Sequence, residues 1–353
     1  MRPALNSPSI FIGVDGKDII SFGSGQPDLP PPERVFKILP DYRQFKYGLI
    51  QGMEKLREAL SRQKEFRGSD KDSFVITNGA SEALDLTFRA ICKPGDKILV
   101  HKPYYYSYVP LIKINHCKPV FTETVKGKIQ IDDFYEKARE CKIVLINSPS
   151  NPTGRVQEIK TLKEIEKFCA DLDITIVSDE VYKDLIYTRE NYMLHGPHVV
   201  TINSFSKTFG MCGFRVGYLY SNDRKIIDRV IEIKTHSSMN TSIIAQEMAY
   251  EATKAPKDYI KKQVAIWKER RDTIYEGLQR LGLDLWKPEG AFYVLPKIKN
   301  PQKAVLTLFK KYKVITYLGS WFGSPERIRL SYALNNDKIE EGLKRIESYL
   351  KHG

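Results

Sequence analysis

The sequence lacks the cysteine and histidine patterns of disulfide-rich and zinc-dependent proteins. Its five cysteines stand far apart, and none belongs to a Cys-x-x-Cys pair: Cys92, Cys117, Cys141, Cys169 and Cys212. This spacing argues against a disulfide framework or a zinc ribbon, and we expect the cysteines to be small buried hydrophobic groups. The six histidines form no His-Glu-x-x-His motif, so we expect no metal site of that type.

Long apolar runs and nucleotide-binding motifs are missing as well. No stretch approaches the roughly 18 consecutive apolar residues of a transmembrane helix. The first residues, MRPALNSPSIFIGVDG, contain no apolar signal-peptide core, so we expect a soluble cytoplasmic protein. Neither a Gly-x-x-x-x-Gly-Lys-Ser/Thr loop nor a Gly-x-Gly-x-x-Gly fingerprint occurs, which argues against a P-loop or a dinucleotide-binding domain.

The composition is that of a globular protein with an excess of positive charge. The 353 residues are 42% hydrophobic and 28% charged, and the length favours two domains. The net charge is +13, which is compatible with nucleic-acid binding. The basic residues are dispersed and mixed with acids, as in KKQVAIWKERR, so we favour a solvated lysine-rich surface.

Apolar strands alternate with amphipathic helices over the first two thirds of the chain. Strands are predicted at 72–77, 96–100, 142–147, 174–177 and 198–203, and helices at 81–91 and 155–172. Strand–helix repetition with apolar strands predicts an α/β fold with a mostly parallel sheet covered by helices on both faces. After about residue 225 the pattern changes: long helices at 257–281 and 337–350 enclose a strand-rich stretch, which indicates a second α+β module.

Polar residues follow four of the predicted strands, where ligands bind in open α/β sheets. These segments are Asn-Gly-Ala-Ser at 78–81, Asn147 to Gly154, Ser-Asp-Glu-Val-Tyr at 178–182 and Asn-Ser-Phe-Ser-Lys at 203–207. The Gly79-Ala80-Ser81 turn opens a helix, and its free backbone N–H groups suit a phosphate.

Lys207 stands out among these residues. Two hydroxyls, Ser204 and Ser206, precede it, and Arg215 follows eight residues later. Hydroxyls and an arginine form a phosphate cup, and an amine beside it suits a carbonyl cofactor that carries a phosphate. Pyridoxal 5′-phosphate (PLP) is such a cofactor; it needs a lysine and an acidic partner, for which Asp179 is the candidate.

The segment SFSKTFGMCGFRVGYL resembles the lysine signature of the class I aminotransferases, PLP enzymes of fold type I. Further blocks resemble that family in the same order: SFGSGQPDLPPP, YGLIQGMEKLREAL, TNGASEAL, KPYYYSY, NSPSNPTG, SDEVYKDL, GAFY and RIRLSYA. The resemblance implies a large PLP-binding domain at 41–250 and a smaller α+β domain built from the N-terminal segment 1–40 and the C-terminal part 251–353.

The resemblance also implies roles around the cofactor ring. Lys207 matches the lysine that bonds to the cofactor and moves a proton as base and then as acid. Asp179 matches the carboxylate that keeps the pyridine nitrogen protonated. Tyr182 and Asn151 match hydrogen-bonding partners of the ring oxygen, and Tyr105 matches the aromatic residue that stacks on the ring. Tyr104, Tyr106 and Tyr108 are alternatives for stacking, or they pack.

For the cofactor phosphate, Ala80 and Ser81 match backbone donors of the family. Ser204 and Arg215 match the side-chain donors, and Ser206 is expected to add a contact.

For the substrate and the partner subunit, Arg329 matches the arginine that grips the substrate α-carboxylate. Gly25 and Asn151 match neighbours of that carboxylate. Tyr47 matches a tyrosine that reaches the phosphate of the partner subunit in a homodimer with shared active sites.

Two departures from the family pattern concern the substrate. Trp321 stands where the family usually has a smaller residue, and Leu318 replaces a common proline. Trp321 either reshapes the side-chain pocket or packs.

The sequence therefore predicts an aminotransferase that moves an amino group between an amino acid, either aspartate or one from an aromatic or broad range, and 2-oxoglutarate. A β-elimination lyase on the same scaffold is an alternative. A basic nucleic-acid-binding regulator is another, although we expect no fused DNA-binding domain because only about 20 residues precede the first block. A protein with an inactive site is disfavoured because every expected polar position is filled.

Overall fold

The computed structural model describes residues 8–11, 14, 16, 18–189, 191–256 and 258–352. The rest of the expected N-terminal segment, residues 1–7, 12, 13, 15 and 17, lies outside the described residues. So do residue 190 of the expected large domain and residues 257 and 353 of the expected C-terminal part.

A seven-stranded sheet forms the centre of the described chain, in the order β2-β10-β9-β8-β7-β3-β4. Its strands are β2 (Phe74–Thr77), β3 (Lys97–His101), β4 (Lys118–Thr122), β7 (Ile143–Asn147), β8 (Thr175–Asp179), β9 (Val199–Ser204) and β10 (Gly217–Ser221). All neighbours pair in parallel except β10, which runs antiparallel to β2 and β9. The predicted α/β fold with a mostly parallel sheet is confirmed.

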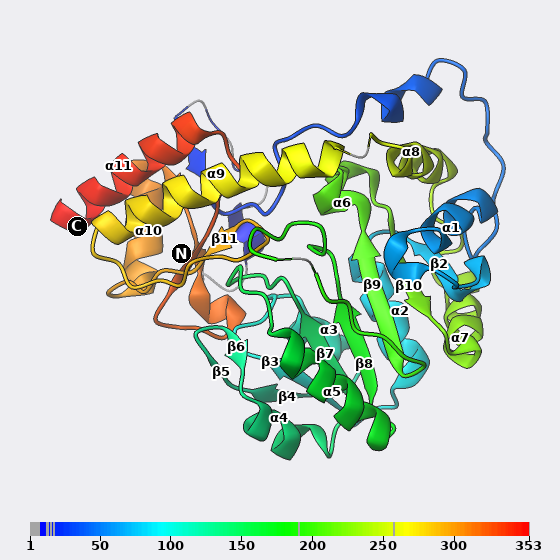
Figure 1. Ribbon diagram of the computed structural model, residues 1–353. Helices are drawn as coiled ribbons and strands as arrows, with labels where there is room; N and C mark the ends of the chain where they lie inside the picture. The colour runs from blue at the N-terminus through cyan, green and yellow to red at the C-terminus, as the bar shows by residue number, and fades with distance from the viewer. Residues whose placement is uncertain are drawn as a thin grey trace.

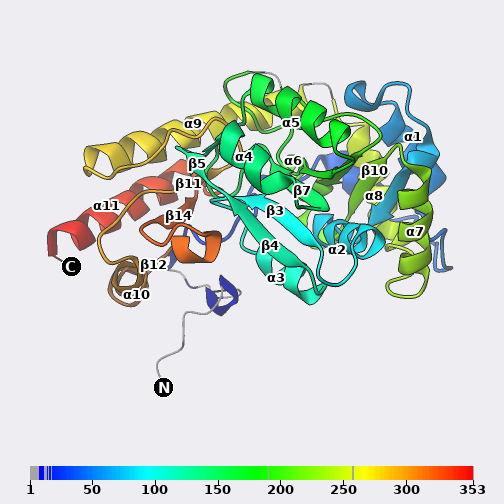
Figure 2. The same cartoon turned by 90° about the horizontal axis from the view of Figure 1, so that it is seen from below.

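Helices cover both faces of this sheet because successive strand residues point to opposite sides. Leu145 packs on the face of α2 (Ala80–Ile91), α3 (Tyr108–Ile114) and α7 (Arg224–Thr235). Its neighbours Val144 and Ile146 pack on the opposite face, under α4 (Ile131–Ala138) and α5 (Ile159–Asp171). Figure 2 shows the two layers from below.

Beside α4 and α5, the same opposite face is also covered by α1 (Glu54–Ser61) and α8 (Ile243–Thr253). The short 3-10 helix Glu33–Ile38 joins them, since its Val35 belongs to the same apolar cluster as Leu56 and Ala249. A hairpin of β5 (Thr124–Val125) and β6 (Lys128–Ile129) projects beyond the sheet.

A second body combines both ends of the chain (Figure 1). Strand β1 (Ile20–Ser21) pairs in parallel with β12 (Val314–Ile315), and β11 (Tyr293–Val294), β14 (Ile328–Ser331) and β13 (Tyr317–Leu318) form a three-stranded sheet. Three helices complete it: α9 (Tyr259–Arg280), α10 (Pro301–Tyr312) and α11 (Asn336–His352). The domain boundaries themselves stay a prediction.

Three details differ from the sequence expectations. The helix expected at 155–172 begins only at Ile159, because the preceding backbone is extended and Val156 N–H donates to the Glu289 carboxylate. Strands β4 and β10 are additional. Of the expected buried cysteines, Cys92 and Cys212 are only half buried.

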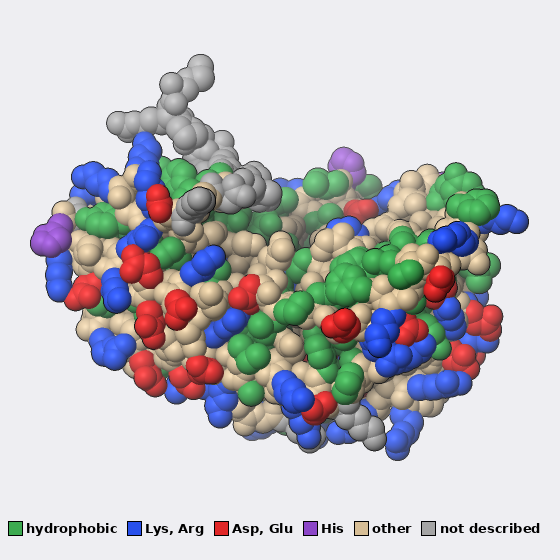
Figure 3. Space-filling view, turned by 90° about the horizontal axis from the view of Figure 1, so that it is seen from above, with side chains coloured by type: hydrophobic (Ala, Val, Ile, Leu, Met, Phe, Trp, Pro, Cys, Tyr) green, Lys and Arg blue, Asp and Glu red, His purple; other side chains and the backbone are tan. Residues whose placement is uncertain are grey.

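The surface carries mixed charges. In Figure 3, lysine and arginine are interspersed with aspartate and glutamate over the face shown. Many of them form ion pairs one helical turn apart, such as Arg62–Glu58 and Lys262–Asp258. This agrees with the solvated lysine-rich surface expected from the sequence. Among the described helices, none is long and apolar enough to cross a membrane.

Phe22 is central to the second body. Its side chain is fully buried, its N–H donates to Ile315, and its carbonyl accepts from Ser331 N–H. Helix α11 passes so close that a Cβ on Gly342 would lie 2.3 Å from the Phe22 ring.

We expect Phe22→Ala to destabilise the cofactor-free protein by about 3–5 kcal/mol, because it leaves a cavity among packed elements. Denaturant unfolding followed by circular dichroism measures the change. Ile114→Ala, at a side chain that is 70% exposed, is the control and should change stability by less than about 0.5 kcal/mol. Equal stability of Phe22→Ala and the parent protein would contradict this account of the packing.

Candidate active site

The carboxyl ends of β2, β7, β8 and β9 meet at one edge of the sheet, because the last three strands run parallel and β2 joins them through β10. The residues that follow these strands are the ones selected from the sequence. Segment 23–25 and strand β14 of the second body approach the same edge, since the Lys207 amine and the Arg329 guanidinium both donate to backbone carbonyls of that segment.

Lys207 lies in the short helix α6 (Phe205–Thr208), directly after β9. Its Nζ donates to the Gly25 carbonyl oxygen at 2.7 Å and lies 3.9 Å from the Cys212 sulfur. Burial lowers the pKa of the Lys207 amine, the Cys212 sulfur opposes this effect, and the charges of Arg329 and Arg215 add to it. The amine is therefore more readily neutral, and hence nucleophilic, than an exposed lysine.

Gly25 needs its small size at this point. A Cβ there would lie 2.1 Å from the Tyr293 hydroxyl oxygen. The structure thus brings Gly25 to the lysine, whereas the carbonyl that touches Arg329 belongs to Gly23, two residues earlier.

Asp179 ends β8 and is buried. Its Oδ2 accepts a hydrogen bond from the Tyr108 hydroxyl at 2.5 Å, and its Oδ1 accepts one from Val181 N–H at 3.2 Å. Among the described residues, no cation pairs with this carboxylate. Burial raises the pKa of Asp179 to about 6, although both hydrogen bonds oppose the rise.

Tyr108 is the residue that sequence reasoning left without a specific role. The segment KPYYYSY offers four tyrosines, and only the helical phase of α3 directs the fourth of them inward to Asp179. Tyr105 is half buried and packs edge-on against Tyr106 and Tyr108, with ring centroids 4.7 and 5.4 Å apart.

Tyr182 and Asn151 both approach the site, but they have different partners. The Tyr182 hydroxyl lies 2.7 Å from the Tyr293 hydroxyl. The Asn151 amide oxygen accepts from the Arg329 guanidinium at 3.2 Å. Asn151 N–H in turn donates to the Asn147 side chain at 2.9 Å, which holds the loop after β7.

The phosphate-cup candidates gather around the start of α2. Gly79, with φ of 81°, precedes Ala80 and Ser81, whose N–H groups begin the helix. A Cβ on Gly79 would lie 2.5 Å from a guanidinium nitrogen of Arg215, so that cation sits directly beside the helix start. Arg215 itself has a left-handed backbone with φ of 57°, a conformation that costs energy for a residue with a Cβ.

The two serines lie on the other side of this cup. The Ser204 hydroxyl lies 2.9 Å from the Ser206 hydroxyl and 3.0 Å from the Val216 carbonyl oxygen, and it accepts from Ser206 N–H. Gly217 lies between the start of α2 and the end of β9, where no side chain fits. A Cβ there would lie 2.9 Å from Ala80 N and 2.7 Å from the Asn203 carbonyl oxygen. Backbone donors, hydroxyls and a guanidinium thus converge where an anion can bind.

Arg329 is 2% exposed and lies within an aromatic cage. Its guanidinium carbon is 4.7, 4.6 and 4.8 Å from the ring centroids of Tyr293, Tyr317 and Phe322. The guanidinium donates to Asn151 and to the Gly23 carbonyl, while none of the described residues forms a hydrogen bond with its Nε. Because a guanidinium carries five donors, N–H groups remain for a carboxylate.

Tyr47 lies apart from this cluster, and Trp321 lies at its edge. Tyr47 is 84% exposed and lies beside an open groove of about 520 Å³ that Met53 and Ile243 also line. Trp321 packs edge-on against Tyr317, with ring centroids 5.5 Å apart. In the described part of the chain, no group of three or more His, Cys, Asp or Glu side chains could hold a metal ion.

Comparison with known proteins agrees with this geometry. The family model described as "Aminotransferase class I and II" matches residues 17–346. A probable aspartate/prephenate aminotransferase of Aquifex aeolicus is 35% identical over 95% of this chain and 92% of its own length. An aspartate aminotransferase of Thermotoga maritima is 34% identical with the same coverage.

Solved structures are similar as well. The crystal structure of the Thermotoga maritima aspartate aminotransferase has a TM-score of 0.90 at 32% identity, covering 98% of this chain and 95% of that one. An aromatic aminotransferase from Pyrococcus horikoshii has a TM-score of 0.88 at 30% identity, covering 98% and 99%.

The raised pKa of Asp179 predicts a pH dependence of stability. A carboxyl with a folded pKa of about 6 and an unfolded value near 3.8 binds more protons when folded, so its contribution falls as pH rises from about 4 to 6. Relative to Asp179→Asn, the cofactor-free parent protein should lose about 2–3 kcal/mol between pH 4 and 7. Urea unfolding at several pH values measures this difference.

Tyr108→Phe should move the same fall to higher pH, because it removes a donor that lowers the pKa of Asp179. The exposed Asp132→Asn controls for the substitution itself. A difference between the parent and Asp179→Asn that stayed constant with pH would contradict the burial effect.

Proposed function

Since the chain belongs to the class I and II aminotransferases, we propose that it transfers amino groups between an amino acid and 2-oxoglutarate with PLP as its cofactor. This family uses PLP. The observation that carries the proposal is the buried Lys207 amine with a lowered pKa, which shares one sheet edge with a buried, unpaired Asp179 and the Arg215 cup.

The residues present fit the cofactor in charge and donor type. The start of α2 at Ala80 and Ser81, together with Arg215, Ser204 and Ser206, would hold the phosphate. Asp179 offers a buried negative charge that lacks a cation among the described residues, and a protonated ring nitrogen would supply one. Tyr182 and Asn151 would bond to the ring oxygen, and Tyr105 would stack on the ring.

When bound, PLP supplies an electron sink for negative charge at the substrate α-carbon. Lys207 provides the base that removes the α-proton and then returns it, because its lowered pKa allows both protonation states. Arg329 holds the α-carboxylate through two parallel hydrogen bonds from a water-poor aromatic cage. Asn151 and the Gly23 carbonyl orient that guanidinium. These residues fix the α-carbon before the proton moves.

For the amino donor we propose aspartate or an aromatic amino acid. The relatives named for aspartate and aspartate/prephenate support the first. The aromatic ring of Tyr317, which lies against Arg329 and packs against Trp321, favours the second. The β-elimination lyase uses the same lysine and aspartate and differs in its products. That this protein lies in the cytoplasm remains a prediction from the sequence.

An activity screen with added PLP tests the reaction. We expect aspartate, tyrosine or phenylalanine to yield its 2-oxo acid only when 2-oxoglutarate is present, with glutamate as the second product. Borohydride reduction should fix the cofactor on Lys207, as seen by peptide mapping. Lys207→Ala should retain PLP through the phosphate cup and lose turnover. Release of ammonia or pyruvate without an acceptor would favour the lyase, and a label on another lysine would overturn the site.

We also propose a homodimer with shared active sites. Three large apolar side chains are unusually exposed on one segment: Phe45 at 88%, Tyr47 at 84% and Leu49 at 59%. Such a patch marks an interface, and a second copy is the occupant expected from the family. Tyr47 would then donate to the phosphate of the partner, since in its own chain it is exposed and lies beside the groove of Met53 and Ile243.

Mixing two inactive variants tests the shared site. Tyr47→Asp and Lys207→Ala should each lack activity, yet a heterodimer combines one site with Lys207 of the first chain and Tyr47 of the second. Co-refolding should therefore restore up to one working site per heterodimer, measured as transamination. No recovery, with heterodimers detected by mass spectrometry, would leave Tyr47 as a packing residue.

A further inference from the structure

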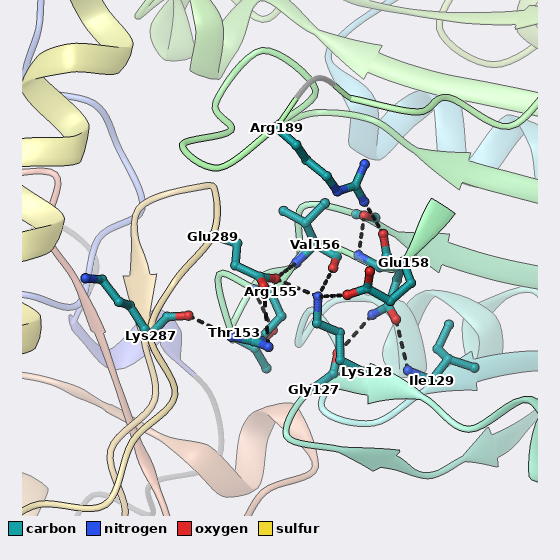
Figure 4. A network of polar contacts seen from close by, with 12 residues as sticks. Gly127, Lys128, Ile129, Thr153, Arg155, Val156, Glu158, Arg189, Lys287 and Glu289 are labelled. Carbon is teal, nitrogen blue, oxygen red and sulfur yellow. Dashed lines mark hydrogen bonds and ion pairs between the residues drawn. The ribbon is translucent and has the colours of Figure 1, made fainter. Parts of the chain in front are cut away.

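We propose that Glu289 is a positioning residue. It fixes the position of the loop after β7 (residues 148–158) relative to the loop at residues 289–293, and thereby the binding of the substrate carboxylate by Arg329. This inference rests on the proposed function for its consequence, but the contacts that carry it lie outside the cofactor and substrate groups described above. Figure 4 shows how Glu289, Val156 and Lys128 lie together.

Glu289 binds the loop after β7 through both its backbone and its side chain. Its N–H donates to the Gly154 carbonyl at 2.7 Å, and its carboxylate accepts from Val156 N–H at 2.9 Å. Gly290 N–H also donates to Gly154, at 2.9 Å. Because the backbone and the side chain of one residue bind residues two positions apart, a slip of either loop breaks several bonds at once.

A neighbouring lysine, Lys128, balances the charge of the Glu289 carboxylate. Lys128, on β6, lies 2.7 Å from Glu289 and 2.9 Å from Glu158, and its amine also donates to the Val156 carbonyl. Lys128 and Glu289 are only 17% and 24% exposed, so their pairing is partly shielded from solvent. Arg155 adds a weaker contact at 3.5 Å. The hairpin β5-β6 is thus tied into the same junction.

The two loops approach so closely that side chains are excluded between them. Gly154 has φ of 64°, and a Cβ there would lie 2.7 Å from the Tyr293 carbonyl oxygen and 3.0 Å from that of Gly290. Gly154 N–H donates to Ser150, and Ser150 N–H donates to Arg155, which closes a tight turn beginning just before Asn151. The contact is therefore rigid on the side of the β7 loop.

Each loop carries one of the groups that surround Arg329. Asn151, three residues before Gly154, accepts from the guanidinium, and Tyr293, four residues after Glu289, lies with its ring against it. A change in register between the loops would move these two groups relative to Arg329. The phosphate cup lies at the ends of β2 and β9, and among the described residues the hydrogen bonds and ion pairs of Glu289 are with other groups. The expected defect is thus in carboxylate binding rather than in cofactor binding.

The test compares Glu289→Gln with Glu158→Gln in the full-length holoenzyme. Glu289→Gln keeps the side-chain size, but one amide oxygen cannot replace a charged carboxylate shared by Val156 N–H and Lys128. Glu158→Gln removes a carboxylate from the same lysine and leaves Glu289 in place, so it is the matched control. Glu158 is 62% exposed, and this substitution should be mild.

We expect Glu289→Gln to raise KM for the amino acid and for 2-oxoglutarate about tenfold, equivalent to ~1.4 kcal/mol, with a smaller change in kcat. The dissociation constant of maleate, an unreactive carboxylate followed by the absorbance of the bound cofactor, should rise by a similar factor. Retention of PLP on dialysis and the behaviour of Glu158→Gln should match the parent protein.

Hydrogen–deuterium exchange of the cofactor-free protein tests the junction without activity. Amides of 150–156 and 289–293 should exchange faster in Glu289→Gln and at the parental rate in Glu158→Gln. Parental KM, maleate binding and exchange in Glu289→Gln would overturn the proposal, as would a parallel loss of PLP. If the parent protein transfers no amino group, the proposed function fails, and the exchange rates alone decide whether Glu289 holds the two loops together.

Discussion

The burial of the Arg329 guanidinium is the constraint on which the arrangement of the site depends. A charge removed from water must be compensated, and here the compensation comes from three parts of the chain. The Gly23 carbonyl comes from the N-terminal segment, the Asn151 amide from the loop after β7, and the aromatic rings from the C-terminal third. Both bodies of the protein therefore contribute to the surroundings of this cation.

The other ionised groups of the site follow the same logic with less compensation. Among the described residues, the Lys207 amine has a backbone carbonyl, a sulfur atom and the Phe292 ring near it, and the Asp179 carboxylate accepts from a hydroxyl and an N–H group. Burial lowers the pKa of Lys207 and raises the pKa of Asp179, and both shifts favour the neutral form of the group. In the cofactor-free protein, this incomplete compensation lowers the stability of the fold. A ligand that brings an anion near Lys207 and a cation near Asp179 would restore that stability on binding.

Much of the fold and of the site was accessible from the sequence because both depend on local signals. Apolar strands followed by polar residues identify the sheet edge, and Lys207, Asp179 and Arg329 do meet near it. The assigned roles of these residues remain predictions. Strand β4 was missed because it is a short, partly buried edge strand that begins Lys-Pro, and β10 because a glycine-rich motif masks its start.

Long-range pairings were beyond sequence reasoning. Nothing local distinguishes Tyr108 from its neighbouring tyrosines, since its partner Asp179 lies 71 residues away. Glu289 likewise pairs with Lys128, which lies 161 residues away in the sequence. Tyr47 is a different case, because its side chain is 84% exposed in the single chain. What the sequence could not supply is therefore the set of contacts that tertiary structure creates.

The parallel pairing of β1 with β12 has a consequence for how the chain folds during synthesis. Residues 74–221 contain every strand of the central sheet, so that sheet can form while the ribosome is still adding the last third of the chain. The first strand, in contrast, must wait for Val314, and Gly23 must wait for Arg329. Until then, β1 and the Gly23 carbonyl lack these two native partners. The part of the site around Arg329, which we propose binds the substrate carboxylate, is therefore assembled last, after the part that would hold the phosphate.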